Sequence, residues 1–264
     1  MHKNYTLPDR ESTQKLLGIL GGLGPMAGVY FCEMLISHTE AQRDCDHINF
    51  LLSSRADTPD RSSFILGQSN DDPTATMIEE ALRLQDAGAD VIAIPCNTAH
   101  YFYDGICRAL RVPVLNIIEE TAAYCKSVGV KKIAVLSTEG TAASGAYQKF
   151  LEAQSIQLIP LERDEQNIIT HIIFDRIKSG KEYDLISFLR VANSLLERGA
   201  ELIILGCTEL SLIKKQNPLP SHFVDSLELL ALAAIAECGK QPVNFDQPLM
   251  KFYGEAMPHR RKGC

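Results

Sequence analysis

The sequence lacks three features that would place the protein in a specialised class. Its longest apolar stretches, such as residues 229–236, are much shorter than the roughly 20 residues that a membrane-spanning helix needs. It has no long run of Lys or Arg, and its formal net charge is -7. We therefore expect no nucleic-acid or membrane partner. Because residues 1–14 are polar and contain no apolar signal-peptide core, a cytoplasmic protein is expected.

The sequence also lacks the cysteine spacings of a disulfide framework or a zinc site. None of its 8 cysteines forms a C-x-x-C pair, so free thiols are expected in a reducing compartment. Cys96 and His100 are spaced so that they could share one helix face and one metal ion. No second Cys/His pair completes such a site, and we therefore expect no metal.

What is present is an alternation of short apolar runs and amphipathic stretches of helical length. The runs are continuous and rich in β-branched residues, which is typical of parallel strands buried on both faces. Strands are expected at residues 15–20, 48–52, 90–94, 112–117, 132–137, 156–161, 201–206 and 222–226. Helices are expected at residues 25–40, 72–87, 98–110, 119–128, 142–154, 164–179, 182–198 and 226–238. This alternation predicts an α/β fold with parallel sheets.

The sequence also repeats itself in two halves. The segment DAGADVIAIPCNT (86–98) aligns with ERGAELIILGCT (197–208). Upstream, each half has a strand, a glycine-containing loop and a helix start, and downstream each has a proline before a strand. These matches occur in the same order and at nearly the same spacing. They predict two similar three-layer α/β domains with parallel sheets, related by a pseudo-twofold axis, with the active site in the cleft between them.

The repeat also suggests domain boundaries. The first domain is expected at residues 1–117 and the second at residues 118–225. A helix that begins near residue 226 is expected to return to the first domain, so that residues 226–247 join it. Residues 248–264 are expected to form a flexible tail.

The most informative residues are Cys96 and Cys207, which follow equivalent strands and precede helices. Ligands bind at the carboxyl ends of parallel strands. The positive end of a helix lowers the pKa of a nearby thiol and favours the thiolate. If the domains face each other, the two sulfurs flank one cleft. Acid–base groups on opposite faces of a small molecule can remove a proton from one side and return it on the other, which is racemisation or epimerisation.

Six segments resemble the cofactor-independent aspartate racemases of the aspartate/glutamate racemase superfamily. They are GILGGLGP (18–25), DTPDRSSFILG (57–67), PCNTAH (95–100), IEET (118–121), GTAASGAY (140–147) and GAELIILGCTEL (199–210). The resemblance implies racemisation of a small acidic amino acid, most directly aspartate, with Cys96 and Cys207 alternating as thiolate base and thiol acid. It also implies that neither pyridoxal phosphate nor a metal takes part, and that the protein forms a homodimer.

The resemblance further implies which residues bind the substrate. Arg61, in PDRS, matches the family's PDRT and is expected to bind a substrate carboxylate, for which a planar guanidinium is suited. Lys178 is expected to hold the other carboxylate. The others expected to bind substrate, several as donors to the α-carboxylate, are Leu23, Ser62, Asn97, Thr98, Thr138 and Thr208.

Five further residues have open roles. His100 would either tune Cys96 or be a satisfied core histidine, and Glu209 would either orient Cys207 or start a helix favourably. Three residues depart from the family pattern. Many relatives have Met where this chain has Leu23, some have Tyr where it has Phe174, and Arg55 adds a positive charge to a stretch that is typically rich in Asn. These departures would alter which amino acid fits.

Other functions remain open at this stage. Gly22-x-Gly24-x-x-Ala27 has the form of a dinucleotide-binding fingerprint, and Arg55 would mimic a contact to a 2′-phosphate. This pattern suggests an NAD(P)-binding oxidoreductase. Related two-cysteine folds racemise glutamate, hydantoins or other amino acids, isomerise maleate or decarboxylate arylmalonates. Two retained cysteines argue against a decarboxylase, which needs one protonating group, and against a catalytically idle binding protein.

Overall fold

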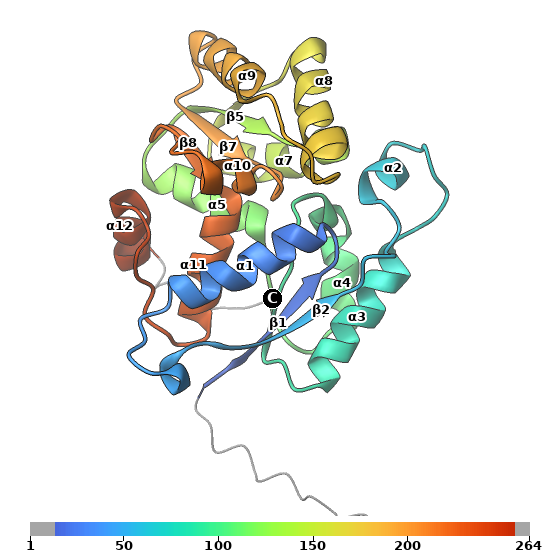
Figure 1. Ribbon diagram of the computed structural model, residues 1–264, viewed down its shortest axis with the longest axis vertical. Helices are drawn as coiled ribbons and strands as arrows, with labels where there is room; N and C mark the ends of the chain where they lie inside the picture. Colours follow the sequence, from blue (N-terminus) through green and yellow to red (C-terminus); the bar gives the residue numbers. More distant parts are fainter. Residues whose placement is uncertain (1–13, 257–264) are drawn as a thin grey trace, which may run out of the picture.

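The protein contains two four-stranded parallel sheets, seen in a computed structural model that describes residues 14–256. The strands of the first sheet are β1 (Leu16–Gly21), β2 (Asn49–Ser54), β3 (Val91–Ala93) and β4 (Val114–Leu115). Those of the second are β5 (Lys132–Leu136), β6 (Gln157–Ile159), β7 (Leu202–Leu205) and β8 (Phe223–Asp225). The strand orders β2-β1-β3-β4 and β6-β5-β7-β8 are equivalent (Figure 1). The predicted pair of like α/β domains is confirmed.

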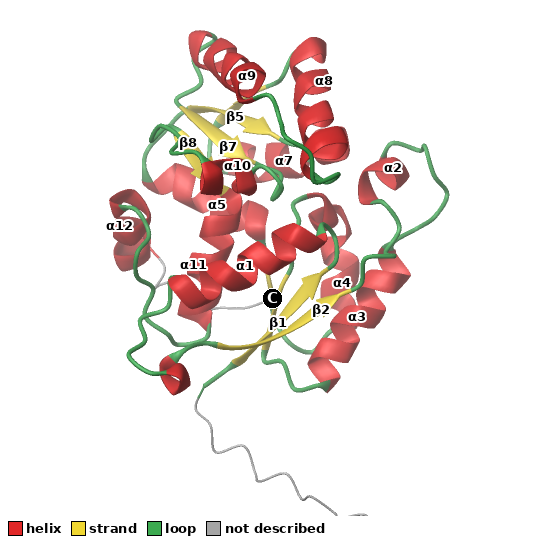
Figure 2. Ribbon diagram, viewed as in Figure 1, coloured by secondary structure: helices red, strands yellow, loops and turns green. Residues whose placement is uncertain are grey.

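Helices cover both faces of each sheet, which makes three layers in each half (Figure 2). In the first half, α3 (Thr74–Asp86) and α4 (Tyr103–Ala109) lie on one face, and α1 (Pro25–Ser37) lies on the other. In the second half, α7 (Ala146–Ala153) packs on one face. The opposite face packs on α8 (Arg163–His171) and α9 (Leu185–Glu197). With both faces covered, the strands carry continuous apolar runs.

Two crossing helices join the halves. α5 (Ile117–Ser127) follows the last strand of the first sheet, and α11 (Ser226–Glu237) follows the last strand of the second. They pack against each other, and α11 also contacts α1, β3 and β4. α11 is apolar all round and almost entirely buried, as expected of a helix without a solvent face. The core around these helices contains side chains from both sheets. The domain boundaries themselves stay predictions.

The expected flexible tail is wrong over the residues that the structure describes. Gln247–Ala256 forms a helix, α12. Leu249 and Phe252 lie one turn apart and are both buried, and the Phe252 ring meets the edge of Tyr124 with 5.5 Å between centroids. Burial of this apolar side explains why the segment is ordered as a helix. Residues 257–264 lie outside the described part of the chain.

Three predicted helices are divided. The helix expected at 98–110 begins as a 3-10 turn, η2 (Thr98–Phe102), before α4. The one expected at 142–154 is split at Gly145, whose φ is 65°, into α6 (Glu139–Ala143) and α7. The one expected at 164–179 passes from α8 into a π-helix, η3 (Ile172–Ile177). π-Helical turns are frequent at functional sites, and this one leads to Lys178.

Short elements were missed by the sequence interpretation. They are η1 (Asp44–Asp46), α2 (Arg61–Ile65) and α10 (Ser211–Gln216). Each has six residues or fewer, too few for a helical period to be recognised in the sequence. α2 and α10 matter for function because they follow β2 and β7 and flank the cavity described below.

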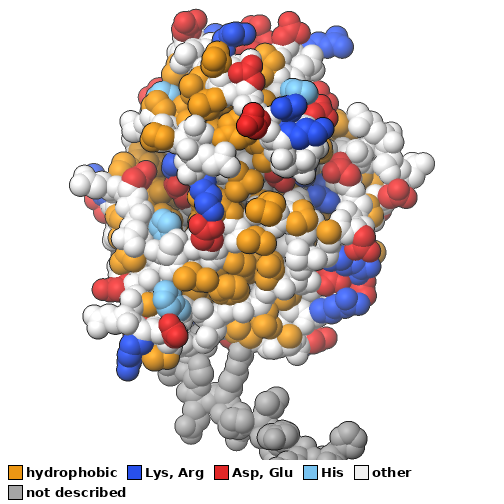
Figure 3. Space-filling model, in the orientation of Figure 1, with side chains coloured by type: hydrophobic (Ala, Val, Ile, Leu, Met, Phe, Trp, Pro, Cys, Tyr) orange, Lys and Arg blue, Asp and Glu red, His pale blue; other side chains and the backbone are white. Residues whose placement is uncertain are grey.

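The outer side of α1 is unusually apolar. Met26, Val29 and Ile36 are 62%, 51% and 49% exposed. Figure 3 shows hydrophobic side chains gathered over the middle of the face that α1 crosses in Figure 1. Exposed apolar patches of this kind are typical of contact surfaces. Over residues 14–256, no helix combines the length and apolarity needed to cross a membrane.

Candidate active site

One small cavity is lined by loops from both halves of the molecule. Its volume is about 280 Å³ with its open side included. The lining contains every site residue predicted from the sequence: Leu23, Arg61, Ser62, Cys96, Asn97, Thr98, Thr138, Lys178, Cys207 and Thr208. It also contains Asp60, Phe174 and Glu209. Asp60 was missed, although an Asp directly before a short polar helix is a recognisable N-cap signal, and it does cap α2 through the Ser63 amide.

Cys96 and Cys207 occupy equivalent places in the two sheets. Cys96 follows β3 and Cys207 follows β7, and each of these strands is paired on both sides. The order of strands reverses beside β3 and beside β7, which is where open parallel sheets bind ligands. Both cysteines are 6% exposed. The fold therefore brings two thiols, held by central strands, to one cavity.

The environment of Cys207 contains an unexpected carboxylate. The Cys207 thiol donates a hydrogen bond to Oε2 of Glu209, with 3.0 Å between Sγ and Oε2. Burial, followed by the charge of Glu209, raises the pKa of Cys207 well above its usual range. Lys178 and the backbone N–H of Glu209 act in the opposite direction but are outweighed. The expected lowering of this thiol pKa by a helix N-terminus is therefore wrong, because α10 begins only at Ser211 and is short.

Glu209 is held by three neighbours. Its side chain is almost fully buried, and Oε1 lies 3.3 Å from the Lys178 ammonium nitrogen. A Cβ atom on Gly24 would lie 2.0 Å from Oε1, so only glycine at this position leaves room for the carboxylate. Burial lowers the pKa of Lys178, but Glu209 and the two thiols raise it further, and the net pKa lies above the usual range. Lys178 is therefore charged, and its Nζ lies 5.2 Å from the centre of the Phe174 ring.

Arg61 is a buried cation without a counter-ion in the described part of the chain. Its guanidinium donates to the backbone carbonyls of Leu23, Pro59 and Thr58, at 2.6, 3.0 and 3.2 Å. Its Nε is buried and has no hydrogen-bond partner. Burying a charge in this way is unfavourable unless an anion pairs with it. Arg61 is thus oriented by the backbone and suited to bind an anion in the cavity, as its sequence motif implied.

Hydroxyl groups connect the two halves beside the cavity. Thr98 Oγ1 lies 3.1 Å from Thr138 Oγ1 and 2.8 Å from Thr141 Oγ1, and Ser62 donates to Thr138 at 3.2 Å. Thr138 also accepts from the Thr141 amide and so caps α6. A Cβ on Gly140 would lie 2.6 Å from the Cα of Ser62, so glycine allows α6 to approach α2. Thr141 lies within the matched segment 140–147 but was not singled out by the sequence interpretation.

The side chains of Asn97 and Thr208 are already engaged. Asn97 donates to Ser226 at 3.0 Å and accepts from the Tyr147 hydroxyl at 2.7 Å. Thr208 donates to the Pro95 carbonyl at 3.2 Å. These bonds join the halves of the molecule. Thr208 has used its single side-chain donor, so donation from Thr208 to a substrate carboxylate would come from its backbone N–H, whereas Asn97 has a second side-chain N–H besides its backbone N–H.

His100 is a satisfied core histidine. Its Nε2 lies 3.2 Å from the Ile117 amide nitrogen and accepts that hydrogen bond, which leaves the ring proton on Nδ1. Nδ1 then donates to the Cys96 carbonyl at 2.9 Å. Burial lowers the pKa of His100 to about 4, so the ring is neutral near pH 7. His100 therefore supports the backbone of Cys96 rather than its sulfur.

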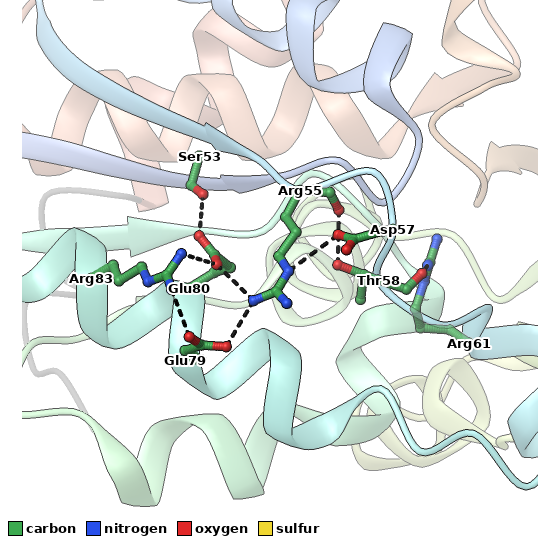
Figure 4. Close-up of polar contacts among 8 residues, drawn as sticks. All are labelled: Ser53, Arg55, Asp57, Thr58, Arg61, Glu79, Glu80 and Arg83. Atoms are coloured by element: carbon green, nitrogen blue, oxygen red, sulfur yellow. Dashed lines mark hydrogen bonds and ion pairs between the residues drawn. The ribbon is translucent and has the colours of Figure 1, made fainter.

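The glycine-rich loop does not fit a dinucleotide. The space beside Gly22, whose φ is 80°, is filled by the Arg55 backbone, and the space beside Gly24 is filled by the Glu209 carboxylate, which would repel a phosphate. Figure 4 shows the Arg55 side chain directed to Asp57, Glu79 and Glu80, with which it forms ion pairs. Arg55 does not line the cavity. The oxidoreductase interpretation is therefore wrong. Over residues 14–256, no cluster of three or more His, Cys, Asp or Glu side chains is arranged to hold a metal.

Comparisons with known proteins identify the family of this chain. Residues 20–234 match the family model described as Asp/Glu/Hydantoin racemase. The broad-specificity amino-acid racemase RacX of Bacillus subtilis is 28% identical over 84% of this chain and 97% of its own length. The structure of Picrophilus torridus aspartate racemase has a TM-score of 0.74 and 30% identity, over 87% of this chain and 96% of that one. A Pyrococcus horikoshii aspartate racemase homologue has a TM-score of 0.69 and 26% identity, over 86% and 100%. The chain therefore belongs to the Asp/Glu/hydantoin racemase family and is an amino-acid racemase.

Proposed function

We propose that the protein racemises a small acidic amino acid, most directly aspartate, by two-base proton transfer between Cys96 and Cys207. The observation that carries this proposal is the equivalent placement of the two thiols after β3 and β7, in the lining of one cavity. In each turnover, one sulfur as thiolate takes the Cα proton. The other sulfur as thiol delivers its proton to the opposite face of the same carbon, which inverts it.

The cations of the cavity support an acidic substrate. Arg61 presents a buried guanidinium with an unpaired Nε, and Lys178 presents a charged ammonium. One carboxylate on each would fix the amino acid and place its Cα between the thiols. Negative charge spreads onto the α-carboxylate as Cα loses its proton, so cationic and N–H donors there stabilise the transition state more than the bound substrate. The names of the relatives include aspartate racemases, which also supports this substrate.

A second candidate substrate class is favoured by one contact. The Lys178 ammonium is already paired with the Glu209 carboxylate at 3.3 Å, so Arg61 is the cation that offers the stronger site for a carboxylate. A site with one dominant cation suits a neutral amino acid with a single carboxylate. The broad-specificity relative from Bacillus subtilis is consistent with this alternative. A racemase of glutamate or another amino acid, and a related two-cysteine isomerase, stay as further alternatives.

Two expectations from the resemblance accompany the proposal. The mechanism above assigns every proton transfer to this chain's own side chains and includes no step for pyridoxal phosphate or a metal. The homodimer stays a prediction, and the apolar outer side of α1 supports it.

The test is racemisation in D2O without added cofactor. Each enantiomer of aspartate, glutamate and a panel of neutral amino acids is incubated with the protein, and optical rotation and Cα deuterium are followed. We expect aspartate to lose rotation fastest and to gain one Cα deuteron per inversion. Racemisation of neutral amino acids alone would replace the acidic-substrate proposal with the second candidate. Undiminished racemisation by a Cys207→Ala variant would overturn the two-base mechanism.

A further inference from the structure

We infer that Glu209 is a positioning residue that keeps the shared proton of the site on Cys207, so that Cys207 is the resting acid and Cys96 the resting base. This inference rests on the proposed two-thiol mechanism and assigns the two thiols unequal roles in the free enzyme. The contact that carries it is the hydrogen bond from the Cys207 thiol to Glu209, 3.0 Å between Sγ and Oε2.

The carboxylate is fixed in a position where it can only stabilise the protonated sulfur. Glu209 is 5% exposed, its second oxygen lies 3.3 Å from the Lys178 ammonium nitrogen, and that oxygen occupies the space that a side chain at Gly24 would fill. An ionised carboxylate accepts hydrogen bonds but donates none. It therefore binds a thiol and repels a thiolate, and in a buried site this repulsion is weakly screened. The raised pKa of Cys207 has the same direction and the same causes, burial first and the Glu209 charge second.

The equivalent position in the other half has no charge. Glu209 is the second residue after Cys207, and Thr98 is the second residue after Cys96. Each of the two side chains packs on the first loop of the opposite half, Glu209 on Gly24 and Thr98 on Thr138. The half that contains Cys207 therefore has a carboxylate at this position, and the half that contains Cys96 has a hydroxyl. The two halves of the fold thus differ at a position that affects which thiol holds the shared proton.

The proton balance shows how this asymmetry would enter turnover. One enantiomer presents its Cα–H to Cys96, whose thiolate breaks that bond, while Cys207 gives its proton to form the new Cα–H bond. The product state has a Cys96 thiol and a Cys207 thiolate, which lies against Glu209. Return of one proton from Cys96 to Cys207 through solvent restores the resting enzyme. The other enantiomer reacts through the same states in reverse. It must therefore bind the less populated form of the free enzyme, which has a Cys96 thiol and a Cys207 thiolate.

Thermodynamics limits where the asymmetry can be seen. Two enantiomers have equal free energies in solution, so kcat/KM is the same in both directions for any variant. If the proton rests mainly on one of the two thiols, kcat differs between the enantiomers and KM differs between them by the same factor. The enantiomer that reacts with Cys96 has the lower KM and the lower kcat. A purely structural role for Glu209 would change both directions equally and would leave these ratios unaltered.

The kinetic test compares both enantiomers of aspartate in the native protein, Glu209→Gln and Glu209→Thr, the last of which copies the residue at position 98. We expect kcat and KM to differ between enantiomers of aspartate by about tenfold in the native protein, the effect of one pKa unit on one thiol. In both variants the two ratios should fall toward 1 together. Glu119→Gln is the matched control, since Glu119 lies exposed in the first turn of α5, and it should keep the native ratios. Unchanged ratios in both Glu209 variants would overturn the inference.

A second measurement needs no substrate. Iodoacetamide reacts with thiolates, and peptide mapping by mass spectrometry reports Cys96 and Cys207 separately in the same molecules. Both are 6% exposed and line the same cavity, so access is matched. In the native protein near neutral pH, we expect iodoacetamide to modify Cys96 several-fold faster than Cys207. Glu209→Gln should accelerate the modification of Cys207, and Lys178→Met should slow the modification of Cys207. Equal reactivity of the two thiols in the native protein, or an unchanged Cys207/Cys96 ratio in Glu209→Gln, would contradict the inference. If this labelling pattern is found but no amino acid is racemised, the proposed function fails and the assignment of the proton stands.

Discussion

The two halves of this racemase have the same strand order but different side chains beside their cavity cysteines. The same strand order brings Cys96 and Cys207 to one cavity. The residue two positions later is then a neutral threonine in one half and a buried glutamate in the other. Repetition of the fold fixes where the sulfurs lie, because equivalent strands end at equivalent places. Side-chain differences at equivalent positions decide what each sulfur does with its proton.

A second pair of equivalent positions shows the same separation of structure and chemistry. Four residues after each cysteine, the chain has His100 in one half and Ser211 in the other. His100 accepts from the first amide of α5, and Ser211 donates to Asp225, the residue that caps α11. Both therefore stabilise the start of a crossing helix. Of these two residues only the histidine titrates itself, whereas Ser211 acts on the buried carboxyl of Asp225, whose pKa is raised by burial.

The largest expected effect comes from removing one thiol at a time. Cys96→Ser and Cys207→Ser should each lower racemisation by about 10³-fold or more, because each variant lacks one of the two proton-transfer groups. Each should still exchange the Cα proton of one enantiomer in D2O, since the remaining sulfur can remove and return a proton on its own face. We expect opposite enantiomers for the two variants, measured by NMR of the recovered amino acid. Exchange of the same enantiomer by both would break the proposed division of the cavity into two faces.

The next effect concerns the two cations, one from each half. Arg61→Lys should reduce kcat/KM for every substrate by about a hundredfold, because loss of charge-assisted hydrogen bonds to a carboxylate removes about 1.5–3 kcal/mol. Lys178→Met should reduce kcat/KM strongly for aspartate and much less for alanine, since only aspartate has a second carboxylate. Steady-state kinetics with both amino acids checks this. An equal loss for aspartate and alanine in Lys178→Met would show that Lys178 acts on the thiols rather than on the substrate.

Lowering the pH should destabilise the native protein through His100. The pKa of His100 is lowered to about 4 by burial, against about 6.5 in an unfolded chain. Between these values the unfolded state binds a proton that the native state does not, so stability falls as pH drops from about 6.5 to 4, by about 3 kcal/mol in all. Urea unfolding at several pH values measures this slope. A His100→Gln variant, although less stable, should lose that part of the pH dependence, whereas Ser211→Ala should retain it.

The fold and the positions of the two cysteines could be predicted from the sequence because the chain repeats its pattern of strands, helices and cysteine motifs. Continuous apolar runs before Cys96 and Cys207 indicated parallel strands, and matching order predicted two like sheets. The contacts that distinguish the halves were not accessible. The ion pair between Lys178 and Glu209 depends on a π-helical turn, and no simple sequence period marks that turn. Glu209 itself was noticed, but its closeness to Gly24 joins residues far apart in the sequence.

The smallest expected effect separates two glycines that follow the first strand of each sheet, Gly24 directly before α1 and Gly140 within α6. A Cβ on Gly24 meets the end of the Glu209 side chain, whereas a Cβ on Gly140 meets the backbone of Ser62 at 2.6 Å. A side-chain carboxylate can move aside, but backbone cannot without shifting α2. Gly140→Ala should therefore lower the free energy of unfolding by about 1–3 kcal/mol, the range for overpacking, and Gly24→Ala by less. Gly24→Ala should instead alter the kcat and KM ratios of the two enantiomers, because it displaces Glu209 from Cys207. Chemical denaturation and steady-state kinetics on the two variants measure both effects, and equal stability losses with unaltered ratios would show that the contact at Gly24 is only a matter of packing.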